Sequence, residues 1–587
     1  MRTIREAVSG LSPSQLYEIG LMTQSTRLRD CVVGTVTTGL VQSWDDLSHY
    51  ATRLMSGDLD SERHWLRFDP VGLCSLARLA ISQCQSTSDL QDAVAIYQAV
   101  LKTTGASLLT TEDRLSLCEA FSTLGRNDEL VSAISEFDLI RIRPLQAAVM
   151  LANRVNSRSQ PGVKQWLEHV NLLYEQDEVS TVMLDEGELP VLDRLSCDAV
   201  PGSVDGPLVT VIIPTHDPGP EIFTSVRSII AQTWLNLEIL VMDDGSAAEF
   251  IPRLRQLEDA DPRVFVIRST QQRGANYVRN VAVSQYSHGD FVTVHGDRGW
   301  SHADRITSQV SHLLESNELG CVCRKASLTD DGKFTRTGST VAYFSIAPDS
   351  VVLRRSAFQQ IGFWRPAPVN SDEDFCSRLQ DAQQRPLHTL GSAHLVLSRI
   401  SEEPLFSSDS MRGFKVAKLR WCDWLARCED EGNKRNGRTT YVGTGVASHA
   451  GIPHNASVTS TSRASFDRVI AAHWGEENPE IDAAVDLARQ LLATGHSVGL
   501  LHVDSPLYGA AQGVSQAVAD LVDGGAIPVA VEDDILVEQT IVLEPLGCWL
   551  SKSRNPQLRS NRIQCDCRVD TGDCLVQWRS GSSDDNE

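Results

Sequence analysis

The stretch from Val209 to Ser246 constrains this chain more than any other, because one continuous run suggests a strand, a helix, a second strand and an acidic turn. Its first part, Val209–Ile213, is apolar and β-branched, which is typical of a parallel strand covered on both faces, and Pro214 is expected to end it. Apolar residues at helical spacing predict a helix from about residue 221 to 232. A second buried strand is expected over Leu237–Met242, so the stretch predicts a βαβ unit.

Polar side chains gather where the two expected strands end. Thr215 follows the first strand, and Asp243 and Asp244 follow the second. In open parallel sheets ligands bind beyond the carboxyl ends of the strands, and carboxylates there can accept hydrogen bonds from a base edge or a ribose hydroxyl. We therefore predict a nucleotide site in which Asp243 and Asp244 contact the nucleotide and Pro214 and Thr215 form the opposite wall.

Six motifs follow one another along roughly a third of the chain: VIIPTHDPGPEI, QTWLNLEILVMDDGS, RGANYVRNVAV, GDFVTVHGDRGWSHADRI, VLRRSAFQQIGFW and SDEDFCSRL. In this order they resemble the family-2 glycosyltransferases of the GT-A fold, although no single motif is specific by itself. The resemblance implies a nucleotide-sugar donor, with a UDP-sugar expected first, and inversion at the anomeric carbon by direct displacement. It also implies that Arg279 flanks the nucleotide side of the cleft and that many members hold a divalent metal on the diphosphate.

The chain departs from the family in the loop after the expected strand Asp290–Val294. Family members usually have something like Gln-Asp-Ala-Asp-Asp-Trp-Ser-His-Pro there, whereas this chain has HGDRGWSH. Aligned on Trp300, the two metal-binding aspartates of this degenerate DXD motif fall on Gly296 and Arg298, and only Asp297 keeps a carboxylate. One carboxylate beside a guanidinium is a poor site for Mn²⁺ or Mg²⁺, which prefer several oxygen ligands. We therefore expect Asp297 to hold metal weakly or not at all.

Two interpretations of this loop stay open. Arg298 could bind the diphosphate in place of a metal, because a guanidinium matches phosphate geometry in bidentate fashion. The loop could equally be a polar surface loop of an inactive site.

A second acidic motif, SDEDFCSRL, supplies the candidate for the general base. Asp372 and Asp374 match the two acidic positions of the family pattern. An inverting transfer needs a carboxylate that accepts the proton of the acceptor hydroxyl, and Asp372 is the first choice, with Asp374 the second. The alternative is an acidic helix start that the helix dipole favours, but the order of the preceding motifs favours the catalytic role.

Composition limits the partners and the compartment. A formal net charge of −23 argues against a broad nucleic-acid partner surface. The N-terminal residues lack the apolar core of a signal peptide, and the chain has no run of 18 apolar residues. The 14 cysteines are scattered, which indicates reduced thiols rather than a disulfide framework. We expect a cytoplasmic protein, or one attached peripherally to a membrane.

The pattern along the chain predicts five segments. These are a helical domain over 1–200, a GT-A domain over 205–428, a linker over 429–463, a Rossmann-like α/β segment over 464–546 and an irregular polar tail over 547–587. The helical part is better described as a plain helical domain than as a repeat array, and its surface could bind a protein partner. The α/β segment lacks a glycine-rich phosphate loop, which favours a structural appendage over a second nucleotide-binding half.

The expected fold class is therefore α/β, with a GT-A nucleotide-diphospho-sugar transferase domain between a helical domain and a smaller Rossmann-like segment. We predict a glycosyltransferase of cell-surface polysaccharide synthesis that moves a sugar, with inversion, from a nucleotide-sugar donor to a glycan or lipid-linked acceptor. The alternative is a degenerate transferase that binds nucleotide, glycan or protein without turnover. An unrelated nucleotide-binding α/β protein is disfavoured by the order of the motifs.

Overall fold

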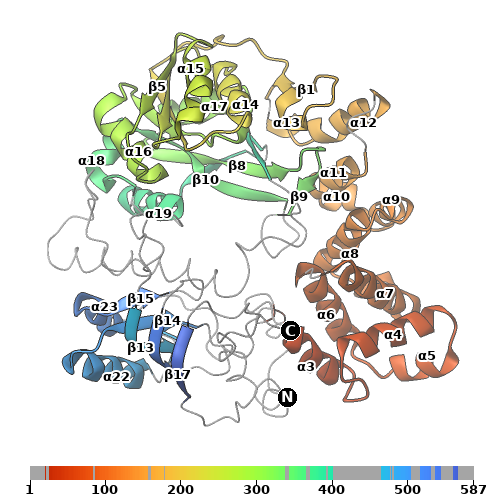
Figure 1. Ribbon diagram of the computed structural model, residues 1–587. Helices are drawn as coiled ribbons and strands as arrows, with labels where there is room; N and C mark the ends of the chain where they lie inside the picture. The colour runs from red at the N-terminus through yellow and green to blue at the C-terminus, as the bar shows by residue number, and fades with distance from the viewer. Residues whose placement is uncertain are drawn as a thin grey trace. The chain divides into compact units, whose positions relative to one another are not determined.

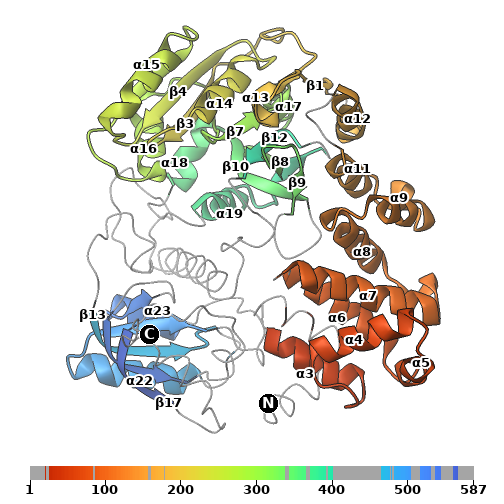
Figure 2. The same ribbon diagram turned by 45° about the vertical axis from the view of Figure 1, so that its right-hand side comes forward.

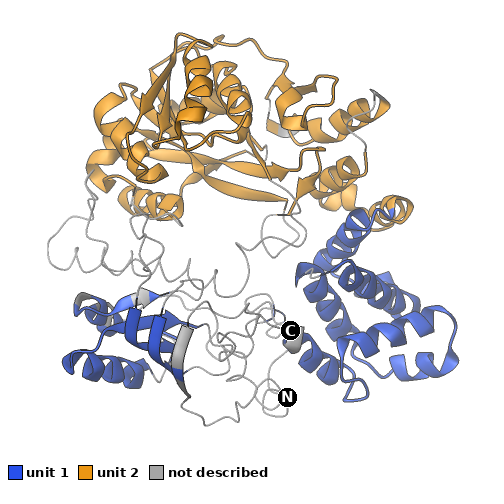
Figure 3. Ribbon diagram, viewed as in Figure 1, with its two compact units in different colours: residues 1–126, 405–438, 449–587 blue, residues 127–404, 439–448 orange. Residues whose placement is uncertain are grey.

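The computed structural model describes residues 17, 20, 26–83, 86–155, 160–177, 179–336, 343–364, 371–391, 394–400, 465–475, 478, 481–503, 516–529, 536–543 and 559–565. Contacts divide the chain into two compact units, coloured separately in Figure 3. Unit 1 comprises residues 1–126, 405–438 and 449–587, and unit 2 comprises residues 127–404 and 439–448. The expected linker over 429–463 and the last part of the expected transferase domain, 401–428, lie outside the described residues.

The first part of unit 1 is helical, as the sequence predicts (Figure 1). Side-chain caps begin two of its helices: the Ser43 hydroxyl accepts from the backbone N–H of Asp46, and Thr110 forms a capping box with Asp113. Buried Leu, Ala and Val side chains cover the facing sides of these helices. They are α3 (Thr26–Val36), α4 (Trp44–Met55), α5 (Leu59–Trp65), α6 (Pro70–Gln83), α7 (Thr87–Thr104) and α8 (Thr111–Thr123).

The last part of unit 1 contains a parallel sheet, whose described strands run in the order β15-β14-β13-β16-β17. The alternation of strands and helices over 464–546 agrees with the predicted pattern. The elements are β13 (Ser465–Ala472), α22 (Ile481–Ala493), β14 (Val498–His502), α23 (Gln516–Asp523), β15 (Ile527–Val529), β16 (Leu536–Val542) and β17 (Arg559–Cys565).

Strand β17 corrects the expected irregular tail over 547–587. Its sequence, RSNRIQC, is too polar to show the apolar alternation by which a strand is recognised. Its backbone nevertheless pairs with β16 over seven residues of chain, from Arg559 opposite Leu536 to Cys565 opposite Val542. Backbone pairing with β16 at the end of the sheet therefore explains this strand.

Unit 2 begins with elements that the sequence assigned to the helical domain over 1–200. They are α9 (Asn127–Glu136), α10 (Leu139–Ile142), α11 (Pro144–Asn153), α12 (Gln160–Asn171), β1 (Val182–Leu184), α13 (Val191–Arg194) and β2 (Leu195–Cys197). Asn153 exchanges two hydrogen bonds with the backbone of Phe334, at 2.9 and 2.7 Å, and the Trp166 indole donates to the carbonyl of Gly332 at 2.9 Å. These contacts join segments 181 and 166 residues apart in the chain, so helical periodicity alone does not reveal them.

A mixed sheet forms the body of unit 2. Its described strands follow the order β5-β4-β3-β6-β10-β8-β12-β7, and β9 and β11 also pair with β8. The first four strands are parallel, whereas β10 is antiparallel to both of its neighbours. The strands are β3 (Val209–Thr215), β4 (Leu237–Asp243), β5 (Val264–Arg268), β6 (Phe291–Val294), β7 (Gly299–Ser301), β8 (Gly320–Leu328), β9 (Phe334–Thr335), β10 (Phe344–Arg354), β11 (His388–Leu390) and β12 (Val396–Arg399).

Helices cover both faces of this sheet (Figure 2). One face packs against α14 (Glu221–Ile230), α15 (Ile251–Glu258) and α17 (Arg305–Glu315), and the other against α16 (Ala275–Val281), α18 (Phe358–Ile361) and α19 (Ser371–Gln383). Short 3-10 or π helices lie at Ala106–Leu108, Glu175–Asp177, Ala248–Phe250, Ala282–Tyr286 and Arg355–Ala357.

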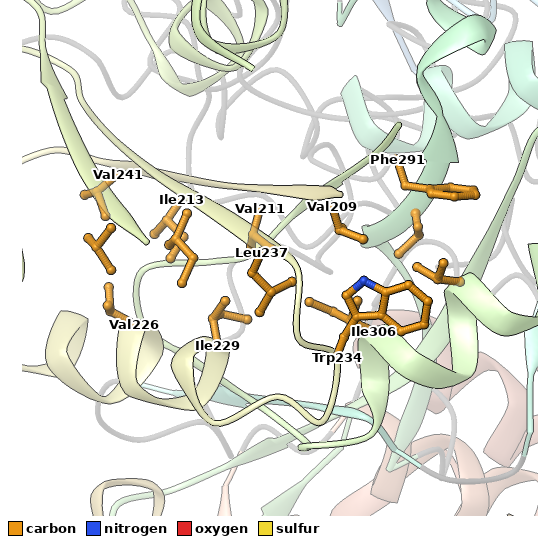
Figure 4. Packing of buried hydrophobic residues seen from close by; sticks show 14 of the residues in the cluster. Val209, Val211, Ile213, Val226, Ile229, Trp234, Leu237, Val241, Phe291 and Ile306 are labelled. Atoms are coloured by element: carbon orange, nitrogen blue, oxygen red, sulfur yellow. The ribbon is translucent and has the colours of Figure 1, made fainter. Parts of the chain in front are cut away.

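The predicted βαβ unit is present, and its side chains alternate as a strand buried on both faces requires. Val211 and Ile213 of β3 face one core, where Val226 and Ile229 of α14 point toward them (Figure 4), while Ile212 faces the other core. Burial on both faces is what the apolar run in the sequence indicates.

Pro214 does not end β3, contrary to the expectation. The strand continues to Thr215 and pairs with β4 as far as Asp243, whereas its pairing with β6 stops at Ile212. Pro214 therefore sits where the strand has a partner on one side only, and its missing N–H removes no hydrogen bond from the sheet.

Among the helices that the structure describes, none is both long enough and apolar enough to cross a membrane.

Candidate active site

The loops after β3, β4 and β6 converge at the carboxyl ends of these strands. Thr215 lies opposite Asp243 in the β3–β4 register, and its carbonyl accepts from the backbone N–H of Asp244 at 2.8 Å. The Thr215 hydroxyl donates to Oδ2 of Asp297 at 2.7 Å. The structure thus brings together four residues that the sequence placed in the nucleotide site.

Asp243 is buried, and both of its oxygens accept hydrogen bonds from the protein. Oδ1 accepts from the backbone N–H of Ser246 at 3.0 Å and from the Ser246 hydroxyl, and Oδ2 accepts from Nε of Arg268 at 3.0 Å. The turn after it needs Gly245, whose φ is 77° and where an added Cβ would lie 2.7 Å from the backbone carbon of Gln271. Asp243 therefore holds the turn in shape.

Asp244 fixes the start of α16. Its two oxygens accept from the backbone N–H groups of Arg273, at 2.8 Å, and Gly274, at 2.7 Å, and Gly274 is the residue that precedes the helix. Burial raises the pKa of Asp244, although these two hydrogen bonds oppose the effect. Because Arg279 lies on the same helix, Asp244 also sets the position of that guanidinium.

Arg298, in the altered loop after β6, pairs with a carboxylate of α14, a contact that the sequence did not indicate. Nε of Arg298 lies 3.2 Å from Oε1 of Glu221, and the Arg298 side chain is 49% exposed. The carbonyl of Gly296 accepts from the Ser225 hydroxyl at 2.9 Å, which ties the loop to α14. In the sequence Glu221 is only the start of a helix, although its position directly after the β3 loop was a signal that it faces the site.

The described residues of this loop fit a divalent metal poorly. Asp297 is half-buried and already accepts from Thr215, while the neighbouring Glu221 carboxylate is paired with Arg298. A hard cation needs several oxygen ligands and gains nothing from an adjacent guanidinium. The proposed reaction therefore does not use a metal bound by this loop.

Asp297→Asn is expected to stabilise the fold slightly at neutral pH. Burial raises the pKa of Asp297 above 3.8, and nearby Glu221 adds to the effect. The folded state thus binds the proton more tightly, so stability is lost as pH rises through the folded pKa, and the ionised form costs stability at pH 7. Melting curves should show an increase of about 1–4 °C at pH 7 that disappears at pH values well below the ordinary range for aspartate. A lower melting temperature at pH 7 would contradict this.

The second acidic motif forms the first turn of α19. Oδ1 of Asp372 lies 2.7 Å from Nη1 of Arg279, the residue expected on the nucleotide side. The same nitrogen donates to Oδ1 of Asn276 at 3.0 Å, and the guanidinium stands 5.8 Å from the centre of the Trp364 ring. Asp372 and Arg279 are 93 residues apart in the chain, and the fold places them in direct contact.

Asp374 has a different environment. It is paired with Arg378, with Oδ2 2.9 Å from Nη2, and the two side chains are only 9% and 3% exposed. Arg378 also donates to the carbonyls of Ile361 and, at 2.9 Å, Phe363. This ion pair therefore fastens α19 to the end of α18.

Residues 210–366 match the model of glycosyl transferase family 2. Over 115 residues the chain is 32% identical to a UDP-Glc:alpha-D-GlcNAc-diphosphoundecaprenol beta-1,3-glucosyltransferase of Escherichia coli, covering 19% of this chain and 44% of that relative. A second Escherichia coli protein with the same enzyme name is 24% identical over 177 residues, which are 29% of this chain and 67% of the relative. The chain thus spans less than half of the length of the first of these relatives.

Among solved structures, the chain is similar to the mannosyltransferase PcManGT from Pyrobaculum calidifontis in complex with GDP-Man and Mn²⁺. The TM-score is 0.29 at 16% identity, covering 41% of this chain and 68% of that one.

The family match extends from the second residue of β3 through the altered loop and stops before α19. It therefore includes Asp243, Asp244 and Asp297, whereas Asp372 lies beyond it. Residues 210–366 are therefore similar to glycosyl transferase family 2, and the structure confirms the expected α/β class for this part of the chain.

Proposed function

We propose that this protein is an inverting glycosyltransferase that moves a sugar from a UDP-sugar to a glycan or lipid-linked acceptor. The observation that supports it most is the 2.7 Å contact between Arg279 and Asp372. Arg279 comes from the helix that Asp244 positions, and Asp372 comes from the second acidic motif, so one contact joins the expected nucleotide side to the expected base. The names of the two Escherichia coli relatives, with UDP-Glc as donor and a diphosphoundecaprenol acceptor, support the choice of donor and acceptor.

Asp372 is the proposed general base. Its Oδ1 is held by Arg279, and its other carboxylate oxygen is the one that would accept the proton of the acceptor hydroxyl as that oxygen attacks the anomeric carbon. Asp374 is not assigned this role, because its ion pair with Arg378 is buried.

Arg298 is the proposed partner of the donor diphosphate. Its exposed guanidinium can exchange the Glu221 carboxylate for phosphate oxygens, which offer the same bidentate geometry and a greater charge. Two hydrogen bonds would keep the loop in place while Arg298 changes partner. The Ser225 hydroxyl donates to the carbonyl of Gly296, and the Thr215 hydroxyl donates to Asp297.

Replacing Arg298 should weaken donor binding, whereas replacing its partner Glu221 should not. Arg298→Gln removes the proposed phosphate ligand and should weaken UDP-sugar binding about tenfold or more, the scale of a hydrogen bond to a charged group. Glu221→Gln removes the competing carboxylate and should leave binding unchanged or tighter. Titration calorimetry measures the UDP-sugar affinity of both variants. If Arg298→Gln bound the donor as tightly as the unaltered protein does, Arg298 would not be a ligand of the diphosphate.

A panel of nucleotide sugars tests the proposal as a whole. UDP-glucose and UDP-N-acetylglucosamine should raise the melting temperature of the full chain, because a ligand that binds only the folded state stabilises it by mass action. The shift should be nearly the same with Mn²⁺ and with a chelator present. Stabilisation by no nucleotide, or only in the presence of Mn²⁺, would argue against this account of the site.

A degenerate transferase that binds without turnover is the second candidate. The altered loop favours it, since Gly296 and Arg298 stand where the family has metal-binding aspartates and Arg298 is paired with Glu221. The two functions are separated by assaying hydrolysis of the nucleotide sugar that gives the largest melting shift. Stabilisation with no release of UDP, with or without a lipid-linked acceptor, would favour the binding role. For the active enzyme we propose a cytoplasmic protein that meets lipid-linked acceptors at the membrane surface.

A further inference from the structure

Two imidazoles and one carboxylate meet at the edge of the unit 2 sheet opposite the proposed donor site. His312 lies in the last turn of α17, Glu318 lies just before β8, and His388 is the first residue of β11. The start of β8 at Gly320 pairs with Leu353, whose neighbour Arg354 pairs with Phe291 at the beginning of β6. The donor site lies at the other end of β6, so the two sites are separate.

The three side chains are close enough to share one ion. Their ligand atoms all lie within 4.8 Å of one another. Nε2 of His312 is 2.9 Å from Oε2 of Glu318, and the His312 and His388 rings are stacked with centroids 4.1 Å apart and an angle of 16° between their planes.

We propose that His312, Glu318 and His388 bind one divalent ion of the borderline class, with Zn²⁺ the first candidate and Co²⁺ or Ni²⁺ as substitutes. Two imidazole nitrogens and one carboxylate are a ligand set that suits these ions. Mg²⁺ and Mn²⁺ prefer more oxygen ligands. The proposal concerns a site apart from glycosyl transfer and does not depend on it.

The surroundings of the Glu318 carboxylate hold it in place. The Glu318 side chain is only 10% exposed, and Nη1 of Arg385 lies 3.5 Å from its second oxygen. The Glu318 carbonyl accepts from Nε of Arg354 at 3.0 Å, which fixes its backbone. Metal-binding carboxylates are commonly held by such outer partners, so the least mobile ligand of the three is already in place.

Modest side-chain movement completes the site. On a tetrahedral zinc ion with bonds of about 2.1 Å, ligand atoms lie roughly 3.4 Å apart. His388 is exposed and can rotate to bring a ring nitrogen closer to the other two ligand atoms, and its exposure leaves a fourth position for water. The bound ion would connect α17, the segment before β8 and β11, so it should stabilise this edge of the sheet.

Zinc binding by the full chain tests the proposal. After treatment with a chelator, the unaltered protein should bind one more Zn²⁺ than His388→Ala or His312→Ala, or bind it at least about tenfold more tightly. Zn²⁺ should raise the melting temperature of the unaltered protein more than that of either variant. Co²⁺ should give visible absorption bands that both variants lose.

His288→Ala is the matched control. Nδ1 of His288 lies 2.7 Å from Oε1 of Glu238, so it is also a histidine–carboxylate pair, but it belongs to no three-ligand group among the described residues. This variant should bind zinc like the unaltered protein. Equal zinc stoichiometry and affinity in the unaltered protein, His312→Ala and His388→Ala, or no zinc binding by the unaltered protein, would overturn the proposal. Because none of these three readouts uses glycosyl transfer, failure of this proposal is distinguishable from failure of the proposed function.

Discussion

Asp372→Asn is expected to reduce turnover by about 100-fold or more while donor binding stays the same, the usual scale for the loss of a general base. Asparagine has the same shape, and its carbonyl oxygen can still accept the hydrogen bond that Arg279 donates at 2.7 Å. It cannot take up the proton of the acceptor hydroxyl. The effect should therefore appear in kcat, whereas the affinity for the UDP-sugar should not change.

Steady-state rates with a lipid-linked acceptor, together with calorimetry of donor binding, measure the two quantities separately. Arg279→Lys provides a comparison, because it keeps a positive charge beside Asp372 but loses the planar guanidinium. Full activity of Asp372→Asn would exclude Asp372 as the base. A parallel loss of donor affinity would instead indicate a role in binding.

Asp374→Asn should act on stability, with an expected loss of about 3 kcal/mol in the free energy of unfolding. The ion pair with Arg378 is buried, with side-chain exposures of 9% and 3%. Removing one partner leaves a buried guanidinium without its counter-charge, which is among the most costly single substitutions. Urea unfolding should show the loss, and the folded fraction should retain its turnover.

The double variant Asp374→Asn with Arg378→Met separates the charge from the packing. It removes the uncompensated guanidinium and should recover part of the lost stability. Recovery should be incomplete, because Arg378 also donates to the carbonyls of Ile361 and Phe363. If Asp374→Asn folded with normal stability but lost turnover, Asp374 rather than Asp372 would be the base.

Asp372→Asn is expected to lower turnover and Asp374→Asn to lower stability, and the sequence alone does not predict this difference. Both are acidic residues of one helix turn, two positions apart, and the motif alone leaves either as the base. Arg279 approaches from α16 and Arg378 from the following turn of the same helix. Only the first partner is distant in the chain, so the difference between the two carboxylates could not be predicted from local pattern.

Glu221 illustrates the same limit at the altered loop. The resemblance predicts that Gly296 and Arg298 occupy positions where the family has metal-binding aspartates. It does not show that the Arg298 guanidinium lies 3.2 Å from Glu221, because that contact depends on how the β3 and β6 loops pack together.

The sequence by itself determined the βαβ unit and the order of the motifs. Apolar strand runs, apolar residues at helical spacing and polar residues at strand ends are local properties, so they can be recognised without the fold. The sequence also predicted the alternating strands and helices of β13 to β16. Only the tertiary structure decided that Pro214 lies within β3, that α9–α12 belong to the same unit as the sheet, and that the polar segment Arg559–Cys565 is a strand. These features depend on backbone pairing and hydrogen bonds between segments far apart in the chain, which leave no periodic signal in the residues themselves.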